Sequence, residues 1–457
     1  MQAKISCGSI EIPLTFPSTV DVKILTPHPP NLEKDILSSF RKSLSHPIGP
    51  SLHSIAVNKR GIFFVQDQTR SVKEKEELAE AIFEELSKGK PSELHVMIST
   101  GTHKPNTEKD LKIIEMLKEK SFKYGVECTF EIHDSEQDKD ASEYTKHILL
   151  GKTPAVTPIY AHRKHMEADF LIGVTSMKMH YFAGYSNMLK LLALPGPSGY
   201  ETVRRNHELI LDPRSLACSH PLHYSNKDNP VANDMYEAYK LIVKHKLVNG
   251  KIKELEKQRP VFILASVSDT EKGETGIVWS AAGEAEEVTR QGIKEIDQHY
   301  TFSSEPSDIV ILGAGPHPYD RHLFYVHNGA DTARRGLKKG GKMLVIAECP
   351  EGIGPEGEQT KKFVEAVKKP KEEILDYVRG NFQVGMQKSY KLGELLNKAS
   401  EICFYLSPNG KLDESELHEM HLSTTRDPQA WLDGKLSEKP DSKILIITKE
   451  ATRVALV

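Results

Sequence analysis

Five side chains in the first half of the chain could together do acid–base, anion-binding and nucleophilic chemistry. They are Arg70, His103, His180, Lys190 and His207. An arginine guanidinium binds a carboxylate or a phosphate through two parallel hydrogen bonds. Histidine exchanges protons near neutral pH. A lysine between apolar residues is partly desolvated, which favours the neutral, nucleophilic amine. This set of residue types indicates a candidate active site.

Each residue also has a simpler explanation. Asp67-Gln68-Thr69-Arg70 could be a turn closed by an internal Asp–Arg pair, and His103 could make one backbone hydrogen bond. Lys190 could extend its ammonium group to solvent from an apolar run, and His207 could lie on a helix surface. Taken alone, each residue leaves both explanations open.

The elements that precede these polar loops favour a shared site. Strand-like apolar runs at Gly61–Gln66, Leu94–Ser99 and Asp169–Val174 come before them. Helical patterns at Val72–Lys88 and Thr107–Tyr124 lie between the strands, and the second opens on a capping-box-like Thr-x-x-Asp. Short apolar strands alternating with helices predict a parallel sheet. Because such sheets bind ligands at the carboxyl ends of their strands, we expect the loops to converge on one cleft.

The second half of the chain repeats the alternation. A long charged helix over 232–257, broken at Asn249-Gly250, reads as a connector. Further strands are predicted at Val261–Ser266, Asp308–Gly313, Lys342–Ala347, Ile402–Leu406 and Lys443–Thr448. Helices are predicted between them at Glu284–His299, Ala330–Lys338, Gln359–Arg379 and Leu392–Lys398. We therefore expect two α/β domains with mainly parallel sheets, over residues 1–258 and 259–457, and an active site in the cleft between them.

The composition limits the partners and the compartment. With 457 residues, 38% hydrophobic and 27% charged, the chain is expected to be globular. A net charge of -3 gives no reason to expect nucleic acid or an anionic membrane. No apolar run approaches ~18 residues and no signal core is seen, so we expect a cytoplasmic protein. The five cysteines are an odd number without a Cys-x-x-Cys pair, which favours reduced thiols over a cysteine zinc site.

The order and spacing of the motifs resemble the nickel-dependent lactate racemase family, from about residue 8 to the C-terminal strand. The resemblance rests on Asp67-x-Thr69-Arg70, Gly101-Thr102-His103, the segment His180-Tyr181-Phe182-Ala183-Gly184-Tyr185-Ser186, Lys190 followed by Pro195-Gly196, Asn206-His207, Pro318-Tyr319-Asp320, and Glu348-Cys349-Pro350-Glu351-Gly352-Ile353-Gly354.

The resemblance implies a nickel-pincer nucleotide, a pyridinium mononucleotide whose sulfur-containing arms grip nickel. It implies that Lys190 forms the covalent tether and that His207 is the protein ligand of nickel. His103 and His180 would be the two acid/base groups, and Arg70 would hold the substrate carboxylate. The cofactor-site residues that it implies are Asp67, Thr69, Gly184 and Ser186.

These roles agree with the chemistry of inverting a 2-hydroxy acid. Removing its α-proton is hard because the carboxylate is already negative. Moving the hydrogen as hydride to a cofactor avoids that charge. One base must then take the hydroxyl proton on each face, which calls for two histidines.

The chain also departs from the family pattern. Asn187, Met188 and Leu189 stand where the family usually has glycines. Tyr325 and Asn328 stand where the family has the Gln and Lys that contact lactate. We therefore expect that one of the positively charged side chains that bind the substrate carboxylate is missing. Hydrogen-bonding groups in its place favour a different substrate, a sugar acid being one candidate.

The leading hypothesis is a racemase or epimerase, a paralogue of lactate racemase acting at C2 of a small 2-hydroxy acid, with a homodimer left open. One alternative is a zinc enzyme in which His103, His180 and His207 bind the metal. Another is a family member without catalysis that binds a nucleotide or a small acid.

Overall fold

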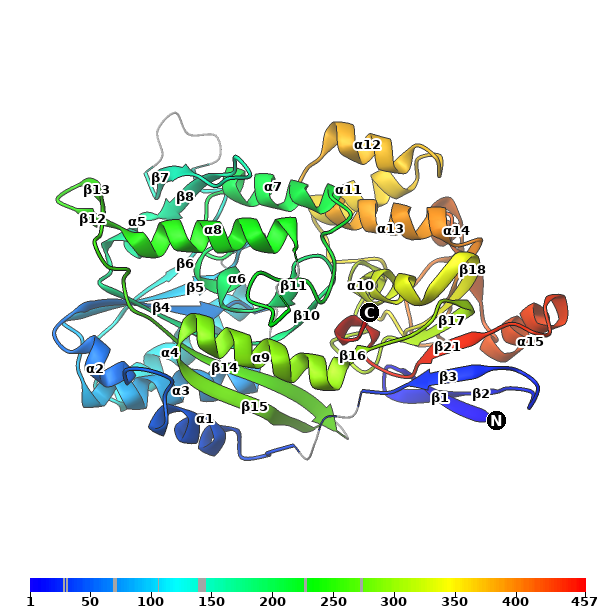
Figure 1. Cartoon of the computed structure of the whole chain (residues 1–457), viewed down its shortest axis with the longest axis horizontal. Helices are drawn as coiled ribbons and strands as arrows, with labels where there is room; N and C mark the ends of the chain where they lie inside the picture. Colours follow the sequence, from blue (N-terminus) through cyan, green and yellow to red (C-terminus); the bar gives the residue numbers. More distant parts are fainter. Residues whose placement is uncertain are drawn as a thin grey trace.

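The apolar runs form two six-stranded sheets in a computed structural model that describes residues 1–27, 29, 32–68, 72–105, 107–138, 145–225, 228–271 and 274–457 (Figure 1). The first sheet has the order β15-β14-β9-β4-β5-β6. Its strands are β4 (Arg60–Gln66), β5 (Glu93–Ser99), β6 (Thr129–Ile132), β9 (Phe170–Ser176), β14 (Val261–Glu271) and β15 (Glu274–Glu284). All neighbours are parallel except the hairpin β14–β15.

Helices cover both faces of this sheet, because its central strands are apolar on both sides. Along β4, Ile62 and Phe64 belong to one core, and Phe63 and Val65 to the other. The Phe63 face is covered by α1 (Ile36–Ser45), α2 (Leu52–Ala56), α3 (Val72–Lys88) and α4 (Glu108–Lys123). The Ile62 face is covered by α6 (Met188–Leu192), α7 (Tyr200–Glu208), α8 (Pro230–Lys244) and α9 (Ala285–Tyr300).

The second sheet is parallel throughout, in the order β20-β19-β18-β17-β21-β3. Its strands are β3 (Val22–Leu25), β17 (Ser307–Gly313), β18 (Leu337–Ile346), β19 (Glu401–Tyr405), β20 (Ser423–Thr425) and β21 (Ile444–Ile447). One face packs against α10 (Leu323–Ala333), α11 (Glu358–Val367) and α13 (Met386–Lys398). The hairpin of β1 (Gln2–Cys7) and β2 (Ile10–Thr15) and helix α15 (Pro428–Glu438) cover the other.

Smaller elements complete the chain. They are β7 (His147–Lys152), β8 (Pro158–His162), α5 (Arg163–Glu167), β10 (Lys178–His180), β11 (Gly184–Ser186), β16 (Thr301–Phe302), α12 (Ile374–Asn381), α14 (Glu414–Glu419), β22 (Ala455–Leu456), and three short 3-10 helices at Leu209–Leu211, Arg334–Gly336 and Ala451–Arg453. No helix in the described part of the chain is both long and apolar enough to span a bilayer.

The division of the chain between the sheets differs from the expected boundary at residue 258. The predicted strand at Val261–Ser266 exists as β14, but it pairs with β9 in the first sheet. The N-terminal strand β3 pairs with β21 in the second sheet, and Figure 1 shows β1–β3 (blue) beside β21 and α15 (red). The sequence does not predict the sheet to which β14 and β3 belong, because each of these strands pairs with a distant segment and contains no local signal of its partner.

The predicted connector helix over 232–257 is wrong beyond its first half. Helix α8 ends at Lys244 and is followed by a hairpin of β12 (His245–Val248) and β13 (Lys251–Glu254). Asn249 and Gly250 turn the chain with φ values of 52° and 75°. Asn-Gly between two short runs is a strong hairpin signal, because both residues tolerate positive φ.

Other predicted helices are confirmed or need small corrections. Helix α3 has the predicted bounds, and the capping box of α4 forms through reciprocal bonds between Thr107 and Asp110. The helix predicted at 330–338 begins at Leu323 instead. The helix predicted over 359–379 is two helices, α11 and α12, separated by a segment that contains Pro370.

Candidate active site

The predicted polar loops lie at the carboxyl ends of strands in the first sheet. Asp67 follows β4, His103 follows β5, and the hairpin β10–β11 follows β9. Because these strands are parallel, their carboxyl ends lie at one edge. Thr69 and Arg70, which the sequence predicts in the cofactor and substrate sites, lie outside the described residues.

The first acid/base candidate is a histidine held by a carboxylate. His103 Nδ1 lies 2.5 Å from Oδ2 of Asp67, which is buried, while the imidazole is about half exposed. Lys75 Nζ donates to the Asp67 backbone oxygen at 2.5 Å. A carboxylate on one ring nitrogen fixes the tautomer and directs the other nitrogen outward. Asp67, predicted in the cofactor site, therefore contacts His103 directly.

Contacts from distant segments hold the His103 loop. Gly101 has a φ of 60°, and a Cβ there would lie 3.0 Å from the side chain of Pro195, so the loop packs closely on the segment after α6. Gln359 Nε2, at the start of α11, donates to the backbone oxygen of Thr102 at 2.7 Å. One acid/base candidate is thus positioned by both halves of the molecule.

The second candidate, His180, contacts the predicted tether lysine. His180 Nε2 lies 2.7 Å from Lys190 Nζ. The backbone N–H of Ala183 donates to His180 Nδ1 at 3.2 Å, so the neutral ring carries its proton on Nε2. That proton then points at Lys190 Nζ, which can accept it only as a neutral amine. This hydrogen-bond pattern favours the nucleophilic form of the lysine.

The residues that replace the family glycines face away from this contact. Asn187 is the N-cap of α6, and its side chain accepts from the N–H of Leu189 at 2.8 Å. Met188 and Leu189 are fully buried in the core beneath the sheet, whereas Lys190 is only half-buried. Their bulk is therefore accommodated by core packing and by a helix cap.

The predicted nickel ligand, His207, is buried and has a defined tautomer. Its Nδ1–H donates to the Val203 backbone oxygen at 2.9 Å, which leaves the lone pair on Nε2. Burial lowers the pKa of His207 to about 3. A neutral imidazole with a free lone pair is the form that binds metal. The neighbouring Asn206 has a structural role, since its amide donates to Asp234 and to Val231.

Two further predicted cofactor residues, Gly184 and Ser186, lie in hairpin β10–β11. Gly184 has a φ of 72°, and a Cβ there would lie 1.9 Å from the backbone oxygen of Ser219. Close backbone packing therefore explains this glycine. Ser186 is buried and pairs with Lys178 across the hairpin. Their role toward a cofactor stays a prediction.

Comparisons with known proteins show which proteins this chain is similar to. A family described as the lactate racemase N-terminal domain matches residues 7–217. A lactate racemase from Thermoanaerobacterium thermosaccharolyticum is 28% identical over 333 residues, 71% of this chain and 68% of the relative. One from Lactiplantibacillus plantarum is 26% identical over 328 residues, 70% and 68% of the two chains. Residues 7–217 therefore belong to the lactate racemase N-terminal domain family, and about 70% of the chain is similar to lactate racemases.

Solved structures share the fold of this chain. The lactate racemase apoprotein from Thermoanaerobacterium thermosaccharolyticum superposes with a TM-score of 0.80 over 100% of both chains, at 22% identity. A structural-genomics crystal structure from Thermotoga maritima gives 0.60 at 15% identity, over 94% of this chain and 99% of the other. The identities of 26–28% to lactate racemases fit a paralogue.

On the side of the second sheet, the protein has cations that sequence reasoning missed. Lys178 Nζ donates to the hydroxyl of Tyr325 at 3.1 Å, and Lys388 Nζ donates to Oδ1 of Asn328 at 2.8 Å. Two lysines from other segments therefore lie next to Tyr325 and Asn328, so positive charge is present beside these two residues. Lys178 could have been found from its position two residues before His180, since alternate residues of a strand share a face. Lys388 gave no signal, because its burial depends on how α13 packs.

A three-histidine metal site is not formed by the described residues. No group of three histidine, cysteine, aspartate or glutamate side chains among them is arranged to hold an ion. His103, His180 and His207 therefore do not have the geometry that the zinc alternative requires. The family resemblance implies only one histidine ligand of nickel, and His207 is a neutral histidine suited to that role.

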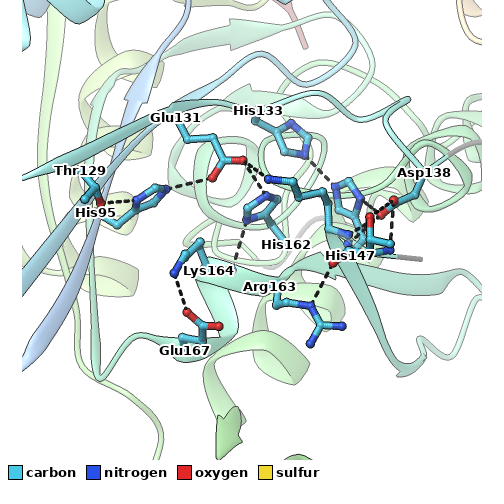
Figure 2. A network of polar contacts seen from close by, with 12 residues as sticks. His95, Thr129, Glu131, His133, Asp138, His147, His162, Arg163, Lys164 and Glu167 are labelled. Atoms are coloured by element: carbon cyan, nitrogen blue, oxygen red, sulfur yellow. Dashed lines mark hydrogen bonds and ion pairs between the residues drawn. The ribbon is translucent and has the colours of Figure 1, made fainter. Parts of the chain in front are cut away.

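A second set of histidines forms a polar network with Asp138 and Glu131 (Figure 2). Thr100 Oγ1 donates to the backbone oxygen of His133, whose Nε2 lies 3.1 Å from His147 Nε2. His147 Nδ1 lies 3.0 Å from Asp138. Burial works against ionisation of Asp138, but hydrogen bonds led by His147 hold its pKa at about 2. Burial also keeps the pKa of His133 well below its usual value, so the centre of this network is neutral.

Proposed function

We propose that the protein inverts C2 of a small 2-hydroxy acid with the help of a nickel-pincer nucleotide. The observation that carries the proposal is the grouping around the ring of Phe182. Its centroid lies 4.6 Å from the ring of His180, 5.5 Å from that of His207, and 5.9 Å from Lys190 Nζ. A base, a neutral metal ligand and a nucleophilic amine thus share one surface.

The residues fit the cofactor that the family resemblance implies. Lys190, held as an amine by His180, is suited to form an amide-type bond with an acid or thioacid group. His207 presents its Nε2 lone pair, and its low pKa keeps that pair available at neutral pH. When bound, the nickel-pincer nucleotide supplies the hydride acceptor.

The protein's own part in the reaction is to bind the acid and to move one proton. Arg70, by resemblance, orients the substrate carboxylate. His103, oriented by Asp67, takes the hydroxyl proton of one enantiomer. Once Lys190 is acylated, its nitrogen no longer accepts the proton of His180 Nε2, so this ring nitrogen is released to exchange the hydroxyl proton of the other enantiomer. Return of the hydrogen to the opposite face of the keto acid gives inversion.

The test is to produce the full chain together with cofactor biosynthesis and to follow C2 stereochemistry over a panel of 2-hydroxy acids. We expect inversion of at least one acid, one nickel per chain, and added mass at Lys190. Lys190→Arg should abolish the added mass, whereas Lys178→Arg, a matched lysine in the same region, should keep it. Absence of inversion together with absence of nickel and of added mass would refute the proposal.

A further inference from the structure

The most unusual cation of the molecule is the ammonium group of Lys388, in the first turn of α13. Its side chain is only 9% exposed, and no carboxylate lies within ion-pair distance among the described residues. Asp331, the carboxylate whose charge acts on the pKa of Lys388, pairs with Arg334 instead. Buried lysines normally have a carboxylate partner, because an unpaired buried charge is costly.

What holds Lys388 is neutral. Its Nζ donates to Asn328 Oδ1 and lies 4.5 Å from the ring centroid of Phe324 and 5.1 Å from that of Tyr181. An amide oxygen and two aromatic faces orient an ammonium group without cancelling its charge. This arrangement leaves the charge available to an incoming anion.

The group also lies next to the candidate active site. The ring of Tyr181 stacks on that of His180 at 5.2 Å. One turn earlier on α10, Tyr325 accepts a hydrogen bond from Lys178, which shares a strand face with His180. Each of these four polar residues, Tyr325, Asn328, Lys178 and His180, is partly exposed, whereas most residues around them are buried.

We propose that Lys388, positioned by Asn328, binds a carboxylate of the substrate. The inference rests on the proposed function. It identifies Lys388 as a residue through which the second half of the chain binds the substrate. The carboxylate is either the one at C1 or a second one farther along the acid, and the two cases predict different ligand preferences.

The pairing makes ligand binding depend on pH. Burial lowers the pKa of Lys388 to about 7, with Asp331 opposing the shift. The other groups that face it are the imidazoles of His322 and His327, kept neutral by burial, and the phenol of Tyr181, whose pKa burial raises. Since only the ammonium form attracts an anion, affinity falls as pH rises. Between pH 6 and 8.5 the charged fraction, and with it the affinity, should drop roughly 30-fold.

The test is calorimetric titration of the full chain with lactate and gluconate, which carry one carboxylate, and with malate, which carries two. We expect binding at pH 6.5 with proton uptake above pH 7. Lys388→Met should weaken it about 10- to 100-fold and remove the pH dependence. A preference for malate that disappears in Lys388→Met would assign the second carboxylate, and equal losses for all three acids would assign the C1 carboxylate.

Two further variants separate binding from folding. Asn328→Asp keeps the lysine but gives it a carboxylate partner, so it should weaken binding by a similar factor. Lys391→Met removes a buried lysine one turn away that is paired with Glu394, and should leave ligand affinity unchanged. Wild-type affinity in Lys388→Met, affinity independent of pH, or no binding of any acid by the parent would overturn the inference. Lys388-dependent binding without inversion would keep the subsite and remove the proposed racemase activity.

Discussion

The pH dependence of unfolding measures how strongly the fold keeps the ring of His207 neutral, which is the form that binds metal. The buried ring has a pKa of about 3, against 6.5 for an unperturbed histidine. Each pKa unit is worth about 1.4 kcal/mol, so charging the folded ring costs about 5 kcal/mol more than charging the unfolded one. Because the folded value is the lower one, the unfolded chain binds the proton first as pH falls. The contribution of His207 is therefore complete above about pH 6.5 and is lost between pH 6.5 and 3.

Between pH 7 and pH 5 this loss amounts to about 2 kcal/mol of unfolding free energy. The assay is denaturant unfolding of nickel-free protein at both pH values, for the parent and for His207→Asn. Asparagine can still donate to the Val203 oxygen but does not titrate. The difference between the two pH values should be about 2 kcal/mol smaller in the variant. Equal acid sensitivity of the two proteins would refute the reasoning, since it would mean that the folded ring titrates normally.

Three other substitutions test the geometry of the site. Asp67→Asn should leave the stability of the fold nearly unchanged but lower the inversion rate about 100-fold or more. Nitrogen NMR should show that His103 has lost its preferred tautomer, and an unaltered tautomer would contradict the assigned contact. Gly184→Ala should cost about 3 kcal/mol or more, since its Cβ would meet the Ser219 oxygen at a positive φ; a normal thermal unfolding curve would exclude this packing. Asn187→Ala should lower the unfolding free energy by about 1–2 kcal/mol through loss of the α6 cap, and no change would show that packing alone holds the helix.

The sequence predicted best those elements whose signal is local. Strands β4 and β5 are short apolar runs that end in polar loops, and their bounds are confirmed almost to the residue. The capping pattern at Thr107 is likewise local, since it spans only the four residues from Thr107 to Asp110. By contrast, the place of β14 in the first sheet depends on pairing with β9, about 90 residues earlier, and nothing in Val261–Ser266 distinguishes one sheet from the other.

The same limit applies to the candidate site. The individual residues His103, His180, Lys190 and His207 were identifiable from their motifs. That Asp67 binds His103 was not, because two separate loops make the contact. Lys388 was missed for a physical reason: an isolated lysine in a helical segment is normally solvated, and only the packing of α13 against α10 desolvates it.

The pairing of β3 with β21 has a consequence for how the protein is made. Leu25 is paired with Ile447, so β3 has no neighbour in the sheet until 422 further residues have been synthesised. The first sheet, by contrast, is complete once residue 284 has been synthesised. The side with the acid/base loops can therefore form while the side carrying Asn328 and Lys388 is still unfinished. The second sheet gains its β3 strand only once β21 has been synthesised, and a chain that stops before residue 444 leaves the β3 edge open to another molecule.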